Sequence, residues 1–408
     1  MATDYGADSI VEKKPNGRLG IYIHVPFCVR KCNYCDFCSA VADEKEIHRY
    51  AQSLIWEISE YAKASGVFKS SSEDLAPASD NKQAYASNYI VDSIYFGGGT
   101  PSVLPVQDFL NIVNCLKKNF KIDSSAEFTV EVNPRTANEE KLALYKENGV
   151  NRISIGMQSI HENELKILGR IHNYDDFLKT YTMARACGFS NINVDVMYGI
   201  PEQTVGNFSK TIATLAALCP EHISCYGLMV EEGTPFYKNR DALAFPGEDE
   251  EVMMYSLAAE ILKERGYSHY EISNYSKPGC ECRHNLKYWN LEDYLGFGVS
   301  AHSYFGGKRF YNTSIIKEYS NSGVAKYRYD ETDTVGVCPS EYIMLKLRLS
   351  AGLNFEEYEN LFNASFIDGR APKLKRFSEL GLAKLTDSSF ALTEKGFYVS
   401  NTIISELL

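Results

Sequence analysis

Residues 22–38 read YIHVPFCVRKCNYCDFC, and three cysteines in this stretch carry the most specific signal in the chain. They are spaced as Cys28-x3-Cys32-x2-Cys35 on one short loop. Thiolates are soft ligands that suit iron–sulfur clusters or zinc. A structural zinc site takes four ligands from two separated pairs, and no second pair lies nearby. Three thiolates on a four-iron cubane leave one iron open to a small molecule, and a zinc site completed by Cys38 or His24 is the alternative.

The cysteine count points to a reducing compartment. Of eleven cysteines, four lie within residues 28–38, and Cys280 and Cys282 form a second pair. In a reducing cytosol a tight group of cysteines is more often a metal site than a set of disulfides. The other five are expected to be small buried hydrophobic residues: Cys115, Cys187, Cys219, Cys225 and Cys338.

Charge and hydropathy exclude several classes of protein. The chain has 408 residues and a formal net charge of −11, which argues against a general binder of nucleic acid or anionic membranes. No stretch of 18 apolar residues is present, so we expect no membrane span, although peripheral docking to a membrane stays open. The N-terminal twenty residues are polar and lack the apolar core of a secretion signal. A cytoplasmic protein is therefore expected.

Short apolar segments rich in Ile, Val and Tyr alternate with amphipathic segments of helical spacing through the first half of the chain. The predicted strands are Ile21–Val25, Ile90–Phe96, Glu127–Val132, Arg152–Met157, Asn191–Tyr198 and Ile223–Met229. The predicted helices are Glu44–Ala64, Val106–Asn119, Asn138–Asn148, Glu162–Leu168, Asp175–Cys187 and Asn207–Leu218. Six βα units in a row imply a parallel sheet with helices outside it, as a doubly wound sheet or as an incomplete barrel.

The placement of polar and glycine residues favours the barrel. The cysteines follow the first strand and the glycines of residues 97–99 follow the second, while Glu131, Gln158, Asp195 and Tyr226 fall at or near the ends of the other four. The sites of βα barrels lie at this rim, whereas a doubly wound sheet concentrates its site at one switch point. We therefore predict an α/β fold with a partial (βα)6 barrel.

Composition divides the chain into four parts. Residues 1–19 are predicted to be disordered, and residues 20–232 form the barrel, with a polar insertion at 69–88. Residues 233–335 are expected to hold a helix, aromatic loops and glycine turns. Residues 336–408 read as helix, helix, hairpin, helix, which predicts a mostly helical, winged-helix-like domain.

The cysteine spacing, with an aromatic residue at Tyr34, resembles the signature of the radical S-adenosylmethionine (SAM) superfamily. The resemblance implies a partial (βα)6 barrel, a [4Fe–4S] cluster on Cys28, Cys32 and Cys35, and SAM on the fourth iron. It also implies cleavage of SAM to a 5′-deoxyadenosyl radical, with an electron donor such as flavodoxin or ferredoxin. The cofactors supply the difficult chemistry and the protein positions them.

The same resemblance implies which residues line the SAM pocket: Tyr22, Tyr34, Gly98, Gly99, Thr100, Glu131, Gln158, Arg170 and Asp195. The glycines let the backbone approach a ligand closely, and the Arg170 guanidinium suits the SAM carboxylate. Taken without the resemblance, Glu131 reads equally well as a solvated rim carboxylate, Asp195 as a buried structural acid, and Tyr22 as strand core. His24 is expected to brace the cysteine loop.

Six further stretches resemble one branch of the superfamily, which holds anaerobic coproporphyrinogen III oxidase (HemN) and the HemW haem chaperones: YIHVPFC, GGGTPS, NRISIGMQS, LGRIH, DVMYGIP and RHNLKYW. Phe37 stands where HemN has a fourth cysteine, only 27 residues precede Cys28, and residues 284–289 match the HNxxYW motif of HemW. The resemblance therefore implies a haem chaperone that delivers haem to an acceptor haemoprotein. The alternative is an oxygen-independent coproporphyrinogen III oxidase.

The HNxxYW-like segment suits haem chemically. The imidazole of His284 is the type of axial ligand that haem iron takes, and Tyr288 and Trp289 offer flat apolar area. The alternative is that His284 bonds a loop and the two aromatic residues fill core. Cys280, Cys282 and His302 are further candidate ligands.

Overall fold

The structure is a computed structural model that describes residues 10–11, 13, 16–65, 89–321, 328–330 and 336–408. Most of the N-terminal segment predicted to be disordered, and the whole of the insertion predicted at 69–88, lie outside these residues. Within the described residues, no helix has the length and apolar character needed to cross a membrane.

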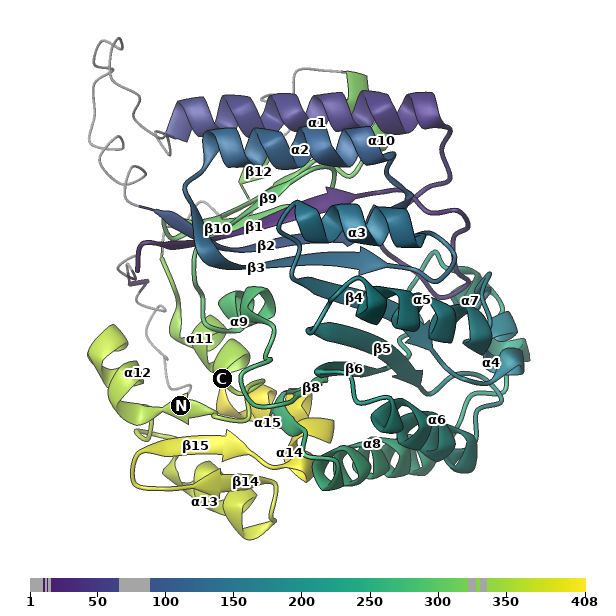
Figure 1. Cartoon of the computed structure of the whole chain (residues 1–408). Coiled ribbons are helices and arrows are strands. Elements are labelled where there is room, and N and C mark those ends of the chain that lie inside the picture. The colour runs from purple at the N-terminus through teal and green to yellow at the C-terminus, as the bar shows by residue number, and fades with distance from the viewer. Residues whose placement is uncertain (1–9, 12, 14–15, 66–88, 322–327, 331–335) are drawn as a thin grey trace, which may run out of the picture.

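Six parallel strands form the barrel, as predicted (Figure 1). They are β1 (Arg18–Val25), β2 (Ile90–Gly98), β3 (Ile122–Val132), β4 (Arg152–Gln158), β5 (Ile192–Tyr198) and β6 (His222–Gly227), paired in chain order. The connecting helices lie outside: α1 (Glu44–Ser65), α2 (Val106–Asn119), α3 (Glu139–Glu147), α4 (Glu162–Ile167), α5 (Tyr174–Ala186) and α6 (Val205–Ala217). The strand order does not join β1 to β6, so the barrel is partial.

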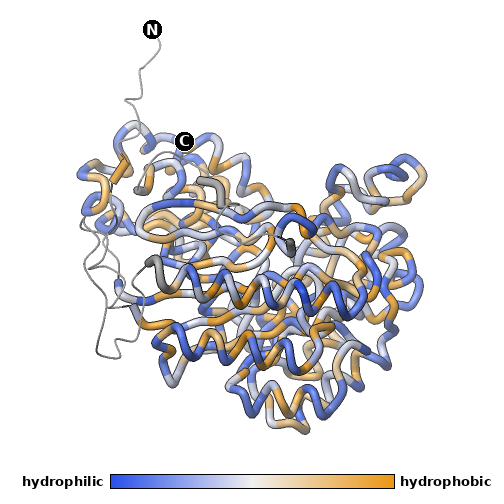
Figure 2. Tube along the Cα trace, turned by 90° about the horizontal axis from the view of Figure 1, so that it is seen from above, coloured by the Kyte–Doolittle hydropathy of each residue, from blue (hydrophilic) through white to orange (hydrophobic). Residues whose placement is uncertain are grey.

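Local chemistry sets where the helices begin. The side chain of Asn138 accepts a hydrogen bond from the backbone of Lys141, so the third helix starts one residue after the segment predicted from periodicity. Asn173 and Asp176 form a reciprocal capping box at the start of α5. Along the surface helices, hydrophobic residues recur among hydrophilic ones (Figure 2). Recurrence at helical spacing gives each helix one apolar face that can pack on the barrel.

Six short strands extend the sheet beyond both edges of the barrel, and the sequence analysis missed them. Next to β1 lie β9 (Tyr294–Phe297), β10 (His302–Phe305), β11 (Lys308–Asn312) and β12 (Arg328–Asp330). Next to β6 lie β8 (Asn274–Ser276) and β7 (Ser268–Glu271). Strands of three to five residues are too short to show a period, which is why this region read as loops and turns.

The helix α9 (Arg283–Trp289) lies at the amino ends of the barrel strands, opposite the side that carries α4 and α7 (Pro235–Lys238) (Figure 1). The carboxylate of Glu127 accepts hydrogen bonds from the first two backbone N–H groups of α9. A Cβ on Gly20 of β1 would lie 2.8 Å from Lys287 and 3.2 Å from His284. Glycine at this position therefore allows α9 to pack into the barrel.

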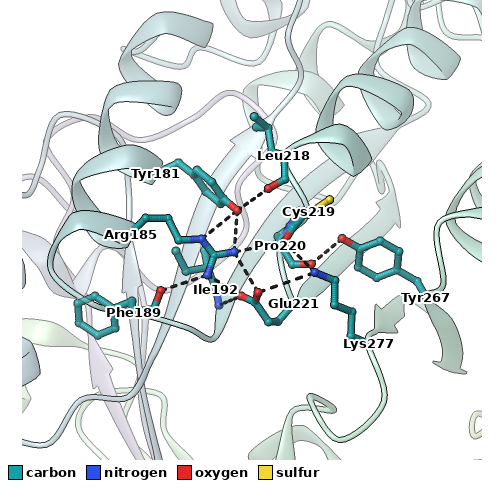
Figure 3. A network of polar contacts seen from close by, with 10 residues as sticks. All are labelled: Tyr181, Arg185, Phe189, Ile192, Leu218, Cys219, Pro220, Glu221, Tyr267 and Lys277. Atoms are coloured by element: carbon teal, nitrogen blue, oxygen red, sulfur yellow. Dashed lines mark hydrogen bonds and ion pairs between the residues drawn. The ribbon is translucent and has the colours of Figure 1, made fainter.

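An ion-pair network ties the amino ends of β5 and β6 together (Figure 3). Arg185 at the end of α5 makes a bidentate contact with Glu221, at 2.8 and 3.1 Å. The same carboxylate accepts from the backbone of Ile192, and Lys277 donates to the Cys219 carbonyl. Planar pairing of this kind holds side chains in one geometry, so the network fixes the barrel's base.

The C-terminal part packs around a second hydrophobic core, which also includes Tyr255, Leu291, Tyr294 and Tyr304 of the preceding segment. It contains α11 (Pro339–Lys346), α12 (Phe355–Phe362), α13 (Ala371–Glu379), the hairpin of β14 (Ala383–Leu385) and β15 (Ser389–Leu392), and α14 (Glu394–Tyr398) with α15 (Ser400–Leu407). The strand β13 (Leu353–Asn354) completes a three-stranded sheet. The hairpin lies between helices as predicted, but three helices precede it and two follow it among the described residues, where two and one were predicted. The long helix α8 (Glu248–Glu264) packs against α6 and α14.

Candidate functional site

A cavity of about 440 Å³ opens at the carboxyl ends of the barrel strands. Eleven of the thirteen side chains or glycines predicted for the site line this one cavity: Cys28, Cys32, Tyr34, Cys35, Gly98, Gly99, Thr100, Glu131, Gln158, Arg170 and Asp195. They come from five different strands or the loops that follow them. Tyr22 and His284 lie elsewhere.

The cysteine loop is held by hydrogen bonds at its first cysteine and between its last two. The backbone of Cys28 donates to Ala40, and Asn33 bonds through its backbone to Leu168 and through its side chain to Ile167, at 3.0 and 2.8 Å. Sequence reasoning passed over Asn33, although its place between Cys32 and Cys35 was a signal. Burial raises the pKa of the Cys28 and Cys35 thiols.

Cys38 and His24 lie behind the loop rather than in the cavity. The Cys38 thiol donates to the Ser314 carbonyl at 3.4 Å. The Nε2 atom of His24 lies 3.0 Å from the Cys38 carbonyl, so the imidazole braces the loop as expected. Its other ring nitrogen is 3.1 Å from the hydroxyl of Tyr22.

The donor set suits a cluster better than one metal ion. Within the described residues, no three His, Cys, Asp or Glu side chains converge as a single ion requires. Cys28, Cys32 and Cys35 nevertheless line the same cavity. A cubane spreads its cysteine ligands over several metal atoms, whereas tetrahedral zinc gathers them at about 2.3 Å from one centre. Thiolates are the ligands that iron–sulfur clusters take, so three thiols on one cavity wall fit a [4Fe–4S] cluster.

The glycines after β2 bring the backbone against the cysteine loop. Gly98 has a φ of +108°, which few side chains tolerate. A Cβ on Gly99 would lie 2.8 Å from the Phe27 carbonyl. The hydroxyl of Thr100, next in the chain, donates to the Cys28 sulfur at 3.4 Å.

In the part of the chain that the structure describes, three buried polar atoms of cavity-lining residues have no hydrogen-bond partner: Oε1 of Gln158, Nε of Arg170 and Nδ1 of His172. Buried polar atoms are nearly always paired in folded proteins, so a group of them points to a polar ligand. Gln158 also has a φ of +65°, a strained conformation for a non-glycine residue. His172 was missed from the sequence, although it lies in the quoted stretch LGRIH.

Arg170 spans the floor between the cysteine loop and the strand ends. One terminal nitrogen lies 3.7 Å from the Cys32 sulfur. The other donates to Asn133 Oδ1 at 2.6 Å and to the Gly156 carbonyl at 2.8 Å. Asn133 was also missed, although it follows Glu131 by two residues in TVEVNP.

Two carboxyl groups meet in the cavity. Burial raises the pKa of Glu131 to about 8, and the charge of Asp195 adds to that rise. Burial likewise raises the pKa of Asp195, while a hydrogen bond from Asn193 at 2.7 Å opposes the change. Tyr95 donates to Glu131 at 2.9 Å. Such groups offer acceptors, and when protonated also donors, to ligand hydroxyls.

Tyr22 and His284 lie in the barrel interior behind the cavity. The ring of Tyr22 stacks on those of Tyr95 and His284, with centroids 6.2 and 6.3 Å away. His284 is fully buried, and its nitrogens lie 2.9 Å from the hydroxyls of Ser93 and Tyr288. Burial lowers the pKa of His284 to about 3. Ligation of a haem iron by this imidazole therefore requires one of the two hydrogen bonds to break.

The comparisons with known proteins agree with this arrangement. The model of the radical SAM superfamily matches residues 22–215, and that of the HemN C-terminal domain matches residues 339–399. Heme chaperone HemW of Bacillus subtilis (strain 168) is 34% identical over 395 residues, which cover 95% of this chain and 98% of that protein. Heme chaperone HemW of Escherichia coli (strain K12) is 34% identical over 335 residues, covering 81% and 82%.

One solved structure is close in fold. Coproporphyrinogen III oxidase (HemN) of Escherichia coli, described as a radical SAM enzyme, has a TM-score of 0.76 and 22% sequence identity. The match covers 96% of this chain and 90% of that one. It therefore includes the barrel, the extended sheet edges and the C-terminal part.

Proposed function

This chain belongs to the HemW family of the radical SAM superfamily, and we propose that it is a haem chaperone that binds haem and passes it to an acceptor haemoprotein. The observation that carries the proposal is the 34% identity to the heme chaperone HemW of Bacillus subtilis over 95% of this chain. A cytoplasmic location and an electron donor such as flavodoxin or ferredoxin belong to the same proposal.

Cys28, Cys32 and Cys35 would hold a [4Fe–4S] cluster, and the open cavity beside them would hold SAM. When bound, the pair supplies one-electron chemistry. The loop keeps the thiols at the cavity wall through the bonds of Asn33 and His24. Because these bonds come from the barrel itself, the ligand geometry does not depend on a flexible loop alone.

The other cavity residues would bind and orient SAM. Arg170 offers a guanidinium beside Cys32, suited to a carboxylate. The backbone of Gly98 and Gly99 admits a close ligand, and Glu131 and Asp195 accept from hydroxyl groups. The unpartnered atoms of Gln158, Arg170 and His172 support a ligand with several polar groups.

Haem is the cargo, and His284 is the proposed axial ligand. Tyr288 and Trp289 on the same helix offer aromatic surface to a macrocycle. Since both nitrogens of His284 are bonded in the structure, we propose that haem binding displaces part of α9. The cysteine loop is at the opposite end of the barrel strands, so we expect haem to bind without the cluster.

A second candidate function is oxygen-independent coproporphyrinogen III oxidation. The observation in its favour is the TM-score of 0.76 to HemN, over nearly the full length of both chains. Phe37 argues against it, because this residue stands where the oxidase resembled above has a fourth cysteine. Fold alone does not decide between a carrier and an enzyme.

One sample tests both functions. The purified protein is reconstituted anaerobically with iron and sulfide, and its haem binding and coproporphyrinogen turnover are then measured on the same preparation. We expect haem binding before and after reconstitution, and no decarboxylation. Conversion of coproporphyrinogen to protoporphyrinogen by the reconstituted wild type would overturn the chaperone and establish the oxidase.

A further inference from the structure

A continuous chain of hydrogen bonds joins two of the three cluster cysteines through a residue that no sequence motif marked. It runs from Cys32 to Arg170, Asn133, Thr100 and Cys28. The donor–acceptor distances along it are 3.7, 2.6, 2.7 and 3.4 Å. Asn133 stands at the centre, and its carboxamide contacts both Arg170 and Thr100.

The direction of every bond in this chain is determined. A guanidinium has donors and no acceptor, so the atom of Asn133 that faces Arg170 must be the carbonyl oxygen. The amide nitrogen therefore faces Thr100 and donates to its hydroxyl oxygen. A cysteine that ligates a cluster is a thiolate with no hydrogen to donate, so the Thr100 hydroxyl is the donor in its contact with the Cys28 sulfur.

We propose that Asn133 is a positioning residue of the cluster site: its oxygen holds Arg170 beside Cys32, and its nitrogen turns the Thr100 hydroxyl toward Cys28. This inference rests on the cluster-binding part of the proposed function and is independent of haem. Hydrogen bonds to the ligand sulfurs are among the factors that set the potential of an iron–sulfur cluster. Asn133 therefore tunes the cluster without touching it.

The substitution Asn133→Asp separates the two arms. Aspartate has nearly the same shape, and it still accepts from Arg170. It has no N–H to offer Thr100, so the hydroxyl hydrogen turns to the new carboxylate and away from Cys28. We expect a more negative midpoint potential for the reconstituted cluster. The added negative charge lowers the potential as well, so a cycle is needed to isolate the hydrogen bond.

The cycle combines Asn133→Asp with Thr100→Val, which removes the hydroxyl and keeps the branched shape. In the Thr100→Val background, Asn133→Asp reports the charge alone. The arrangement predicts that Asn133→Asp shifts the potential further in the wild type than in that background. Asn138→Asp is the matched control, because it adds the same charge outside the cavity lining, at a helix N-cap that aspartate also serves. Equal shifts in both backgrounds overturn the role of Asn133.

A second arm tests the contact with Arg170. Binding of SAM is measured from its effect on the EPR spectrum of the reduced cluster in Asn133→Ala, Arg170→Ala and the double variant. Roughly tenfold weaker binding is expected in each single variant, with little further loss in the double. If the loss of SAM affinity in the double variant equals the product of the two single losses, Arg170 does not depend on Asn133. That result overturns the proposed contact between Asn133 and Arg170.

The experiment remains decisive if Asn133→Asp assembles no cluster. Thr100→Ser keeps the hydroxyl and should keep the wild-type potential, whereas Thr100→Val should shift it. An unchanged potential in Thr100→Val overturns the proposal. If the wild-type protein assembles no cluster, both the cofactor part of the proposed function and this inference are overturned. If it assembles a normal cluster but Asn133→Asp shifts the potential equally in both backgrounds, only the inference is overturned.

Discussion

The polar groups around the carboxyl-end cavity and those around His284 are in opposite states. At the carboxyl end, Gln158, Arg170 and His172 each keep a polar atom without a partner, around a cavity lined by three thiols. At the amino end, both nitrogens of His284 are bonded, and Lys287, only 2% exposed, pairs with Asp92 and Glu292 at 2.8 and 3.2 Å. The network around Arg185 and Glu221 is similarly complete (Figure 3).

This difference indicates which of the two sites is arranged to receive a ligand. An unpaired buried polar atom costs roughly 1–3 kcal/mol, and a ligand that supplies the missing bond recovers it. The carboxyl end is thus arranged before its ligand arrives. The HNxxYW-like segment of α9 is already satisfied, so binding there must replace bonds that exist.

The first prediction concerns the thiols, where the effect should be complete. Cys28→Ala, Cys32→Ala or Cys35→Ala should each abolish the cluster, because each removes one of only three protein ligands. Cys38→Ala is the matched control and should retain it, since the Cys38 thiol faces Ser314 outside the cavity. Iron and sulfide analysis with EPR of the reduced protein measures both. Loss of the cluster in Cys38→Ala would contradict the three-cysteine site.

The carboxyl end was also the end that the sequence could predict. Its residues follow strands whose apolar runs are long enough to recognise, and parallel strands place their carboxyl ends together. Asn133 and His172 were missed because their role depends on a partner far away in the chain, such as Arg170 for Asn133. The short strands β7 to β12 were missed because tertiary pairing, and not a local period, makes them strands.

For His284 the sequence could predict a motif but not its burial. Its contacts come from Ser93 on β2 and Tyr288 on its own helix. Only packing of α9 against Gly20 brings these groups together. A motif identifies residues that a family shares, while the state of their hydrogen bonds depends on the fold around them.

The second prediction tests SAM binding in the cavity whose lining residues keep unpartnered polar atoms. Arg170→Ala and Asp195→Ala should each weaken the effect of SAM on the EPR spectrum of the reduced cluster. Loss of one charge-assisted contact costs roughly 1.5–3 kcal/mol, which is about ten- to a hundredfold in affinity. Arg185→Ala is the control, because this arginine is bonded in the network at the opposite end. Unchanged SAM dependence in both cavity variants would remove these residues from the SAM site.

The third prediction tests haem binding at the amino end, where the nitrogens of His284 are already hydrogen-bonded. If α9 opens for haem, His284→Ala should weaken haem binding or shift the Soret band, because the axial imidazole is lost. Tyr288→Ala and Trp289→Ala should act more mildly, through lost contact area. The titration is done with and without the cluster, and the two should agree. A wild-type spectrum in His284→Ala would move the ligand to another residue, with Cys282 and His302 the first to test.

The last prediction has the smallest expected effect. It concerns how the stability of the haem-free protein changes with pH because His284 is buried. Burial holds the pKa of His284 at about 3, whereas an unfolded chain has a histidine pKa of about 6.5. Below pH 6.5 the unfolded state therefore binds a proton that the folded state refuses, so stability falls as the pH falls. At pH 6 this one group costs about 1 kcal/mol of stability, and the cost grows toward pH 5.

Chemical unfolding of His284→Gln between pH 7 and pH 5 should show a shallower loss of stability than the wild type, even though the variant is less stable at pH 7. If His284→Gln keeps the wild-type slope, the imidazole is not shielded in solution, and α9 opens without haem.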